Sequence, residues 1–155
     1  MDEVDEGGEI QAARKPPSNH TIFAYLAAPF PRDAVRSREL KGERFHYVTA
    51  RTVMNRLDEV LGPWNWSDHY EVTPLGVKCV LTVRLPDGRE VVKEDVGGLS
   101  ATPDASDKEK TAFTDAFKRA AVKFGVGRYL YKDGVPDFVR GILAAEAEAR
   151  KEGRR

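Results

Sequence analysis

Two adjacent basic residues on a long helical pattern are the side chains whose type and placement point most directly to a chemistry. Residues 106–125 predict an amphipathic helix whose apolar side carries Phe113, Ala116, Phe117, Ala120, Ala121 and Phe124. Lys118, Arg119 and Lys123 fall outside that side. Small alanines let a helix approach a sheet closely, so these bases are expected at a helix–sheet seam. A groove lined by Lys and Arg there would hold a phosphate backbone without reading base sequence.

The enzymatic alternative is a metal-dependent nuclease, because the chain contains the residue types that such an enzyme uses. Asp87, Glu90 and Lys93 have the side chains of two-metal phosphodiester chemistry. The usual nuclease arrangement has an acid two residues before the lysine on one strand, and position 91 is valine. The neighbouring Glu94 and Asp95 would point to opposite faces of a strand. A charged hairpin with a Pro-Asp-Gly turn is the simpler interpretation of this stretch.

Other chemistries lack the residues that they need. The sequence has no phosphate-binding loop of the form G-x-x-x-x-G-K-[ST] and no G-x-S-x-G elbow. Its single cysteine excludes an internal disulfide and a multi-cysteine zinc site, and its three histidines stand apart at His20, His46 and His69. We therefore expect no metal, no cofactor and no catalytic residue.

Charge is distributed in blocks along the 155 residues, although 25 Lys and Arg balance 25 Asp and Glu. Residues 1–10 hold five acids and no base, whereas residues 32–56 and residues 105–132 each hold seven bases and three acids. Residues 57–104 hold four bases and nine acids. Blocks of one sign that meet in the fold would make a positive surface that the total hides. Ordinary solvated surface is an equal alternative from charge alone.

The elements that must position the basic residues follow from periodicity and turn signals. Helices are predicted from Ser18 or Asn19 to Pro29, from Thr49 to Gly62, over residues 106–125 and over residues 137–150. Two short strands are expected at 35–40 and 44–48, and three longer ones at 65–73, 77–85 and 90–96, with a loop over 97–104. Alternation in the strand at 77–85 predicts an antiparallel sheet with one covered face, where Cys79 is core.

These elements predict an α+β fold in which an antiparallel sheet packs against a long amphipathic helix in a β-β-β-α core, with short helices and a small N-terminal hairpin. We expect a disordered acidic arm at 1–18, one DNA-binding domain at 19–135 and a C-terminal helix or linker at 136–155. No apolar run approaches the ~20 residues that span a membrane, and the acidic start is unlike a signal peptide. The expected compartment is the cytoplasm.

An ordered set of short motifs resembles the Rad52/Rad22 family of single-strand annealing proteins, in its bacterial and phage branch that includes DdrA-like proteins. The motifs are Tyr47-Val48 through Val53, Leu61-Gly62 with Trp66, Val83 to Gly88, Glu94 to Gly97, Thr114 to Ala120 with Phe124-Gly125, and Val126 to Tyr131. They span roughly residues 20–132 in one order.

The resemblance implies a ring-forming oligomer that binds single-stranded DNA in a positive groove and anneals complementary strands without ATP in recombinational repair. For DdrA-like members it also implies protection of 3′ ends. By position, Lys118 and Arg119 match the family's basic pair beside the DNA, and Arg51 lies one residue before a position that is often basic, held here by Thr52. The predicted DNA contacts are Lys118, Arg119, Arg51, Lys123, Arg128, Lys110 and Arg56.

Further expectations concern partners and stacking. Tyr47, Trp64, Trp66, Tyr129 and Tyr131 are aromatic residues that would stack bases if they are not core. Recombination or replication proteins are possible partners of the C-terminus, and strands 35–48 are candidates for contact with a neighbouring subunit. A DNA-independent oligomeric scaffold is the third class of function that the sequence leaves open.

Overall fold

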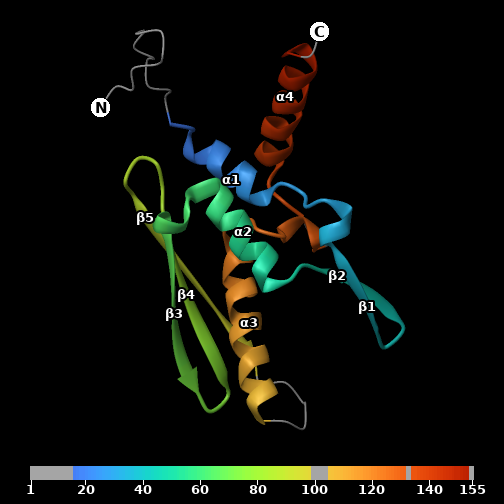
Figure 1. Ribbon diagram of the computed structural model, residues 1–155, viewed down its shortest axis with the longest axis vertical. Helices are drawn as coiled ribbons and strands as arrows, with labels where there is room; N and C mark the ends of the chain where they lie inside the picture. Colours follow the sequence, from blue (N-terminus) through green and yellow to red (C-terminus); the bar gives the residue numbers. More distant parts are fainter. Residues whose placement is uncertain (1–15, 99–104, 132–133, 154–155) are drawn as a thin grey trace, which may run out of the picture.

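The computed structural model describes residues 16–98, 105–131 and 134–153, with the side-chain surroundings of 105–110 left out. The predicted acidic arm therefore lies outside the described residues except for its last three positions, as does most of the predicted 97–104 loop. Within the described part, the fold is α+β with antiparallel sheets and four α-helices, as predicted (Figure 1).

The main sheet contains β3 (Trp66–Thr73), β4 (Gly76–Arg84) and β5 (Glu90–Gly98), paired antiparallel in that order. Alternate residues of β4 point to one side and are almost fully buried: Val77, Cys79, Leu81 and Val83. The helix α3 (Ala105–Lys123) packs against this side and contacts both β4 and β5. Cys79 is thus core, as predicted, and burial raises the pKa of its thiol to about 11.

The close approach of α3 to the sheet depends on a glycine in β5. A Cβ atom built at Gly97 would lie 2.3 Å from the Ala112 carbonyl oxygen and 2.6 Å from the Ala116 nitrogen. Both alanines are completely buried at this contact. Sequence patterning had assigned Gly97 to a loop, and this is wrong, because Gly97 and Gly98 are the last residues of β5.

The other three helices pack in succession, with α2 against α3, α1 against α2 and α4 against α1. The helix α1 (Asn19–Ala27) begins at Ser18, and α2 (Ala50–Leu61) begins at Thr49; each cap side chain accepts a hydrogen bond from a backbone N–H, as their residue types favour. Gly62 ends α2 with a positive φ of 87°. The last helix, α4 (Asp137–Gly153), packs against α1 through Val139 and runs away from the body (Figure 1).

A second sheet is a hairpin of β1 (Arg36–Leu40) and β2 (Glu43–Tyr47), which projects from the body on the other side of α3 from β3 (Figure 1). Lys41 and Gly42 form its turn with positive φ angles of 53° and 82°. Both strands are exposed along their length except at Tyr47. The predicted hairpin is therefore confirmed, with boundaries shifted by one residue.

Short 3-10 turns at Arg32–Ala34, Pro63–Asn65 and Arg128–Leu130 connect these elements. Among the helices of the described residues, none combines the length and apolar character needed to cross a membrane.

Candidate nucleic-acid interface

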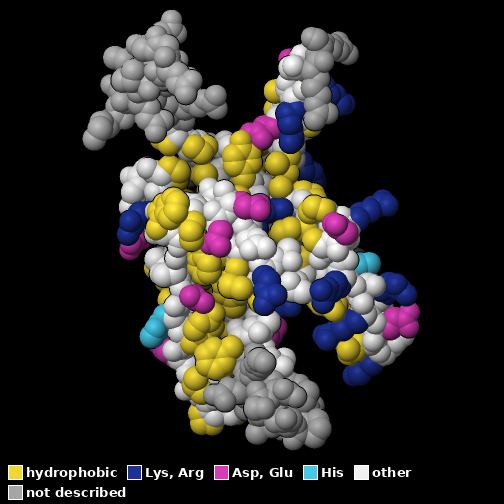
Figure 2. Space-filling view, in the orientation of Figure 1, with side chains coloured by type: hydrophobic (Ala, Val, Ile, Leu, Met, Phe, Trp, Pro, Cys, Tyr) yellow, Lys and Arg dark blue, Asp and Glu magenta, His cyan; other side chains and the backbone are white. Residues whose placement is uncertain are grey.

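A hollow of about 190 Å³ lies between α3 and the hairpin, and we call it the basic groove. It is lined by Arg38, His46, Tyr47, Val48, Val53, Asp115, Lys118, Arg119, Val122, Val126, Gly127, Leu130 and Tyr131. Lys and Arg side chains gather on this part of the surface, over the hairpin and the body beside it (Figure 2). The two basic blocks of the sequence, residues 32–56 and 105–132, thus both contribute bases to this groove and make this part of the surface positive.

Lys118 lines the basic groove as a half-buried base. Its ammonium group donates a hydrogen bond to the Val48 carbonyl oxygen at 3.3 Å and lies 5.5 Å from the centre of the Tyr47 ring. Burial lowers the pKa of Lys118, Asp115 acts to raise it, and nearby Arg38 lowers it further. An ammonium has three donors, so donors remain for an anionic ligand after the bond to Val48 is made.

Sequence reasoning did not select two arginines of the hairpin, of which Arg38 lines the basic groove and Arg36 lies on the same strand. Arg36 pairs with Tyr47 and Arg38 pairs with Phe45 across the hairpin. Directly opposed residues share a face, so both arginines lie on the same face as Tyr47. The Arg38 guanidinium lies 5.8 Å from the Tyr47 ring centre. The sequence does contain a signal for these arginines, because Arg36 and Arg38 are two residues apart and such residues lie on one face of a strand.

Arg119 and Lys123 turn from the hairpin toward the sheet. Successive helical residues are about 100° apart, so Arg119 leaves α3 in a different direction from Lys118, although both side chains line the basic groove. The Arg119 Nε donates to Asp95 Oδ1 at 3.4 Å, and the Lys123 Nζ lies 3.7 Å from Asp95 Oδ2. Lys123 also donates to the Glu94 carbonyl oxygen. Both bases remain about half exposed.

Tyr131 connects the basic groove to a neighbouring hollow that Asp95, Arg119 and Val122 also line. The Tyr131 side chain is 59% exposed. Of the residues predicted to stack bases, Tyr47 and Tyr131 line the basic groove.

The other predicted stacking residues lie elsewhere. Trp66 packs on Phe117 with the ring centres 5.9 Å apart, and the Tyr129 hydroxyl accepts a hydrogen bond from the Phe30 N–H. Trp64 is 78% exposed and borders a different hollow with Arg84.

Two of the remaining predicted contacts, Arg51 and Arg128, do not line the basic groove. Arg51 is exposed in the first turn of α2, and Arg128 lies half-buried in a 3-10 turn. The side chain of Lys110 is outside the described residues. Their roles in DNA binding stay predictions.

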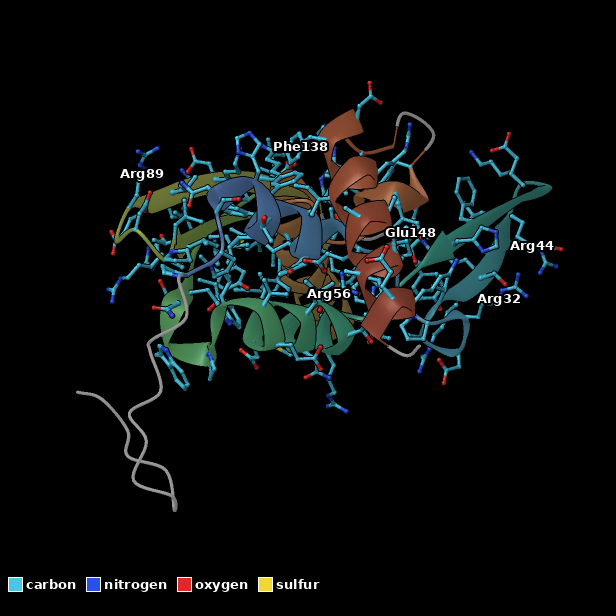
Figure 3. All side chains as sticks on the ribbon, turned by 90° about the horizontal axis from the view of Figure 1, so that it is seen from above. Arg32, Arg44, Arg56, Arg89, Phe138 and Glu148 are labelled. Carbon is cyan, nitrogen blue, oxygen red and sulfur yellow. The ribbon has the colours of Figure 1, made fainter. Side chains whose placement is uncertain are left out.

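Arg56, another predicted DNA contact, is held between α1 and α2 by hydrogen bonds within the fold. Its guanidinium donates to the carbonyl oxygens of Tyr25, Leu26 and Ala28 at 3.2, 3.0 and 2.6 Å. It also stacks 4.1 Å from the Phe30 ring centre, and burial lowers the pKa of Arg56. Figure 3 shows Arg56 between α1 and α2. The side chain thus caps the end of α1, whose last carbonyls have no partner within the helix.

We expect Arg56→Ala to lower the free energy of unfolding by about 2–3 kcal/mol, because three carbonyls lose a charged donor. Arg51→Ala on the same helix removes the same charge from an exposed site and should change stability by less than about 0.5 kcal/mol. Urea unfolding followed by circular dichroism measures both. Equal stability of the two variants would contradict the capping role.

The residues of the nuclease alternative do not converge in the described part of the chain. Asp87 lies in the β4–β5 turn, where it accepts hydrogen bonds from the Arg89 N–H and the Asn19 amide. Glu90 pairs with Arg84 on the outer face of the sheet, whereas Lys93 lies on the helix side, near the Phe124 ring. In Figure 3, Arg89 beside this turn lies at the opposite end of the molecule from Arg44 on the hairpin.

No group of three or more His, Cys, Asp or Glu side chains suited to hold a metal occurs within residues 16–98, 105–131 and 134–153, side chains of 105–110 aside.

The structure combines an antiparallel sheet covered by one long helix with a basic, tyrosine-lined groove whose donors have the chemistry that a phosphate backbone requires. Residues 18–136 match the family described as Rad52/22 family double-strand break repair protein, and the chain belongs to this family. This confirms the family resemblance of the sequence motifs.

Two curated relatives are proteins named single-stranded DNA-binding protein DdrA. The protein from Deinococcus deserti is 39% identical, over 68% of this chain and 54% of its own length. The protein from Deinococcus radiodurans is also 39% identical, over 68% of this chain and 52% of its own length. The chain thus spans about half the length of these relatives.

Proposed function

We propose that this domain binds single-stranded DNA in the basic groove and anneals complementary strands in recombinational DNA repair. The observation that carries the proposal is the convergence of Lys118 and Arg38 on the Tyr47 ring, at a groove in a Rad52/22 fold. The name of the DdrA relatives supports single-stranded DNA as the ligand. The role is binding rather than catalysis, and the cytoplasm is the proposed compartment.

The geometry suits a strand that is held by its phosphates. Lys118 and Arg38 offer charged donors to phosphate oxygens, while Tyr47 and Tyr131 offer ring faces to bases. Neither contact needs a particular base sequence. The edges of bases held in this way stay free to pair with a second strand, and pairing and stacking release about 1.4 kcal/mol per step. Annealing is then downhill and needs no nucleotide cofactor.

Ring assembly, protection of 3′ ends and contact with recombination or replication proteins through the C-terminus extend this proposal. A ring would repeat the groove and hold a longer strand than one subunit does. Light scattering tests assembly, and resistance of labelled 3′ ends to an added exonuclease tests protection.

We expect binding to single-stranded oligonucleotides to exceed binding to duplexes of the same length and to weaken steeply with salt. Each neutralised phosphate of a single strand adds about −0.7 to the slope of log K against log salt. Fluorescence anisotropy at several salt concentrations measures both quantities. Equal weak affinity for the two forms, or no dependence on salt, would refute the proposal.

The same preparation distinguishes the other two classes of function. Magnesium-dependent loss of labelled DNA would favour the nuclease alternative. Assembly without nucleic-acid binding at low salt would favour a scaffold. Faster pairing of complementary oligonucleotides in the absence of ATP would support annealing.

A further inference from the structure

Asp95 is an acidic side chain placed among the bases that DNA binding would use. It pairs with Cys79 across the sheet and so lies on the side that α3 covers. Its two carboxylate oxygens face different bases, with Oδ1 3.4 Å from Arg119 and Oδ2 3.7 Å from Lys123. The side chain is 24% exposed and lines the hollow that adjoins the basic groove.

Asp95 is ionised at neutral pH. Burial acts to raise the pKa of its carboxyl, but the Val96 N–H bond at 2.7 Å and the charges of Arg119 and Lys123 bring the pKa below its ordinary value. A carboxylate offers the same kind of charged acceptor oxygen as a phosphate. Arg119 therefore already donates to an internal anion, and Lys123 forms an ion pair with the same anion.

We propose that Asp95 is a residue that limits affinity and sets the strand's path, because its negative charge offsets the charges of Arg119 and Lys123 that phosphates would otherwise meet. This inference rests on the proposed function. The phosphates of a bound strand then contact the hairpin side of the groove, at Lys118, Arg38 and Arg36. On the sheet side Asp95 offsets one of the two positive charges, so phosphate binds there less tightly unless the Asp95 pairs open.

The strength of these pairs fits a limiting role rather than a complete block. Arg119 and Lys123 have half-exposed side chains, and ion pairs at exposed sites contribute little net stability because water screens them. A phosphate can displace the carboxylate, but at a cost in affinity. This lower affinity of the protein for the strand favours release of the strand once it has paired with its complement.

Asp95→Asn tests the inference. The amide oxygen retains an acceptor for the Val96 N–H but loses the charge that holds Arg119 and Lys123. We expect the dissociation constant for oligo(dT) at about 0.1 M salt to fall roughly 3- to 10-fold. The salt slope should steepen by about 0.7 to 1.4, as one or two further phosphates are neutralised.

Glu94→Gln is the matched control. It removes the same charge from the adjacent residue, whose side chain faces the other side of β5 and pairs with Lys78 at 3.7 Å. Its affinity and salt slope should stay near those of the unchanged protein. An equal gain in both variants would indicate a general effect of net charge and overturn the inference.

Two other outcomes also overturn it. Unchanged binding by Asp95→Asn means that the pairs do not compete with phosphate, and weaker binding means that Asp95 orients Arg119 for DNA instead. If Asp95→Asn fails to fold, Asp95→Ser carries the same expectation with a smaller acceptor. Failure of the unchanged protein to bind oligo(dT) refutes the proposed function as well, whereas normal binding with an inert Asp95→Asn refutes this inference alone.

Discussion

Replacing Lys118 and Arg119 together with alanine weakens binding of single-stranded DNA by about 10- to 100-fold, equivalent to about 1.4–2.8 kcal/mol. Lys118 and Arg119 both line the basic groove, so the variant removes positive charge from it. The salt slope should become shallower by about 0.7 for the phosphate contact of Lys118, because Arg119 is already paired with Asp95. Fluorescence anisotropy across a salt series measures affinity and slope together.

A matched control removes two bases far from the groove. Arg140 and Lys151 lie on α4, where they pair with Asp137 and Glu148 on their own helix. The double alanine variant of these residues has the same net charge as the groove variant and should bind nearly as well as the unchanged protein. Equal losses in the two variants would contradict the position of the groove, provided that both retain the unfolding midpoint of the unchanged protein.

Gly97→Ala should lower the free energy of unfolding by about 3 kcal/mol, because there is no room for a side chain beneath α3. The added Cβ would meet backbone atoms of Ala112 and Ala116 well inside van der Waals contact. Backbone atoms cannot swing aside as the end of a side chain can, so the helix must shift. A shift of α3 also draws Lys118 away from the Val48 carbonyl, and DNA affinity should fall with stability.

Gly98→Ala provides the comparison. This glycine is next in sequence, and a Cβ there meets nothing within 4 Å. We expect its stability to be unchanged or up to about 1 kcal/mol higher, since alanine loses less backbone freedom than glycine on folding. Urea unfolding measures both variants. Similar stability of the two would show that α3 can move from β5 at little cost.

The elements of the fold were largely predictable because their signals are local. Capping by Thr49, termination at Gly62 and alternation around Cys79 each depend on a few neighbouring residues, and the structure confirms all three. The prediction of a loop at Gly97 was wrong because the role of this glycine in β5 depends on a contact that is distant in sequence. Glycine favours loops in sequence statistics, whereas here it allows a distant helix to approach a strand, which no local pattern encodes.

The site was predictable only in part, since it depends on which surfaces meet. Lys118 and Arg119 were found from helical spacing, and they do line the basic groove. Arg38 was missed because its hairpin lies about 80 residues away in sequence and reaches α3 only through the fold. The sequence pattern is typical of a surface base at Arg56, but its guanidinium donates hydrogen bonds to carbonyl oxygens at the end of α1. The position of Arg56 among the apolar residues of α2 does not reveal its contact with α1.

The contacts of Lys118 have a thermodynamic consequence for the arrival of a ligand. Immobilising a free lysine side chain costs up to about 2 kcal/mol of rotamer entropy. Lys118 has already undergone that loss on folding, since its ammonium group is held by Val48 and the Tyr47 ring. Arg36 is exposed, so its side chain loses its freedom only when a strand binds. Lys118 is thus ordered before the first phosphate binds, whereas Arg36 becomes ordered only when the strand binds.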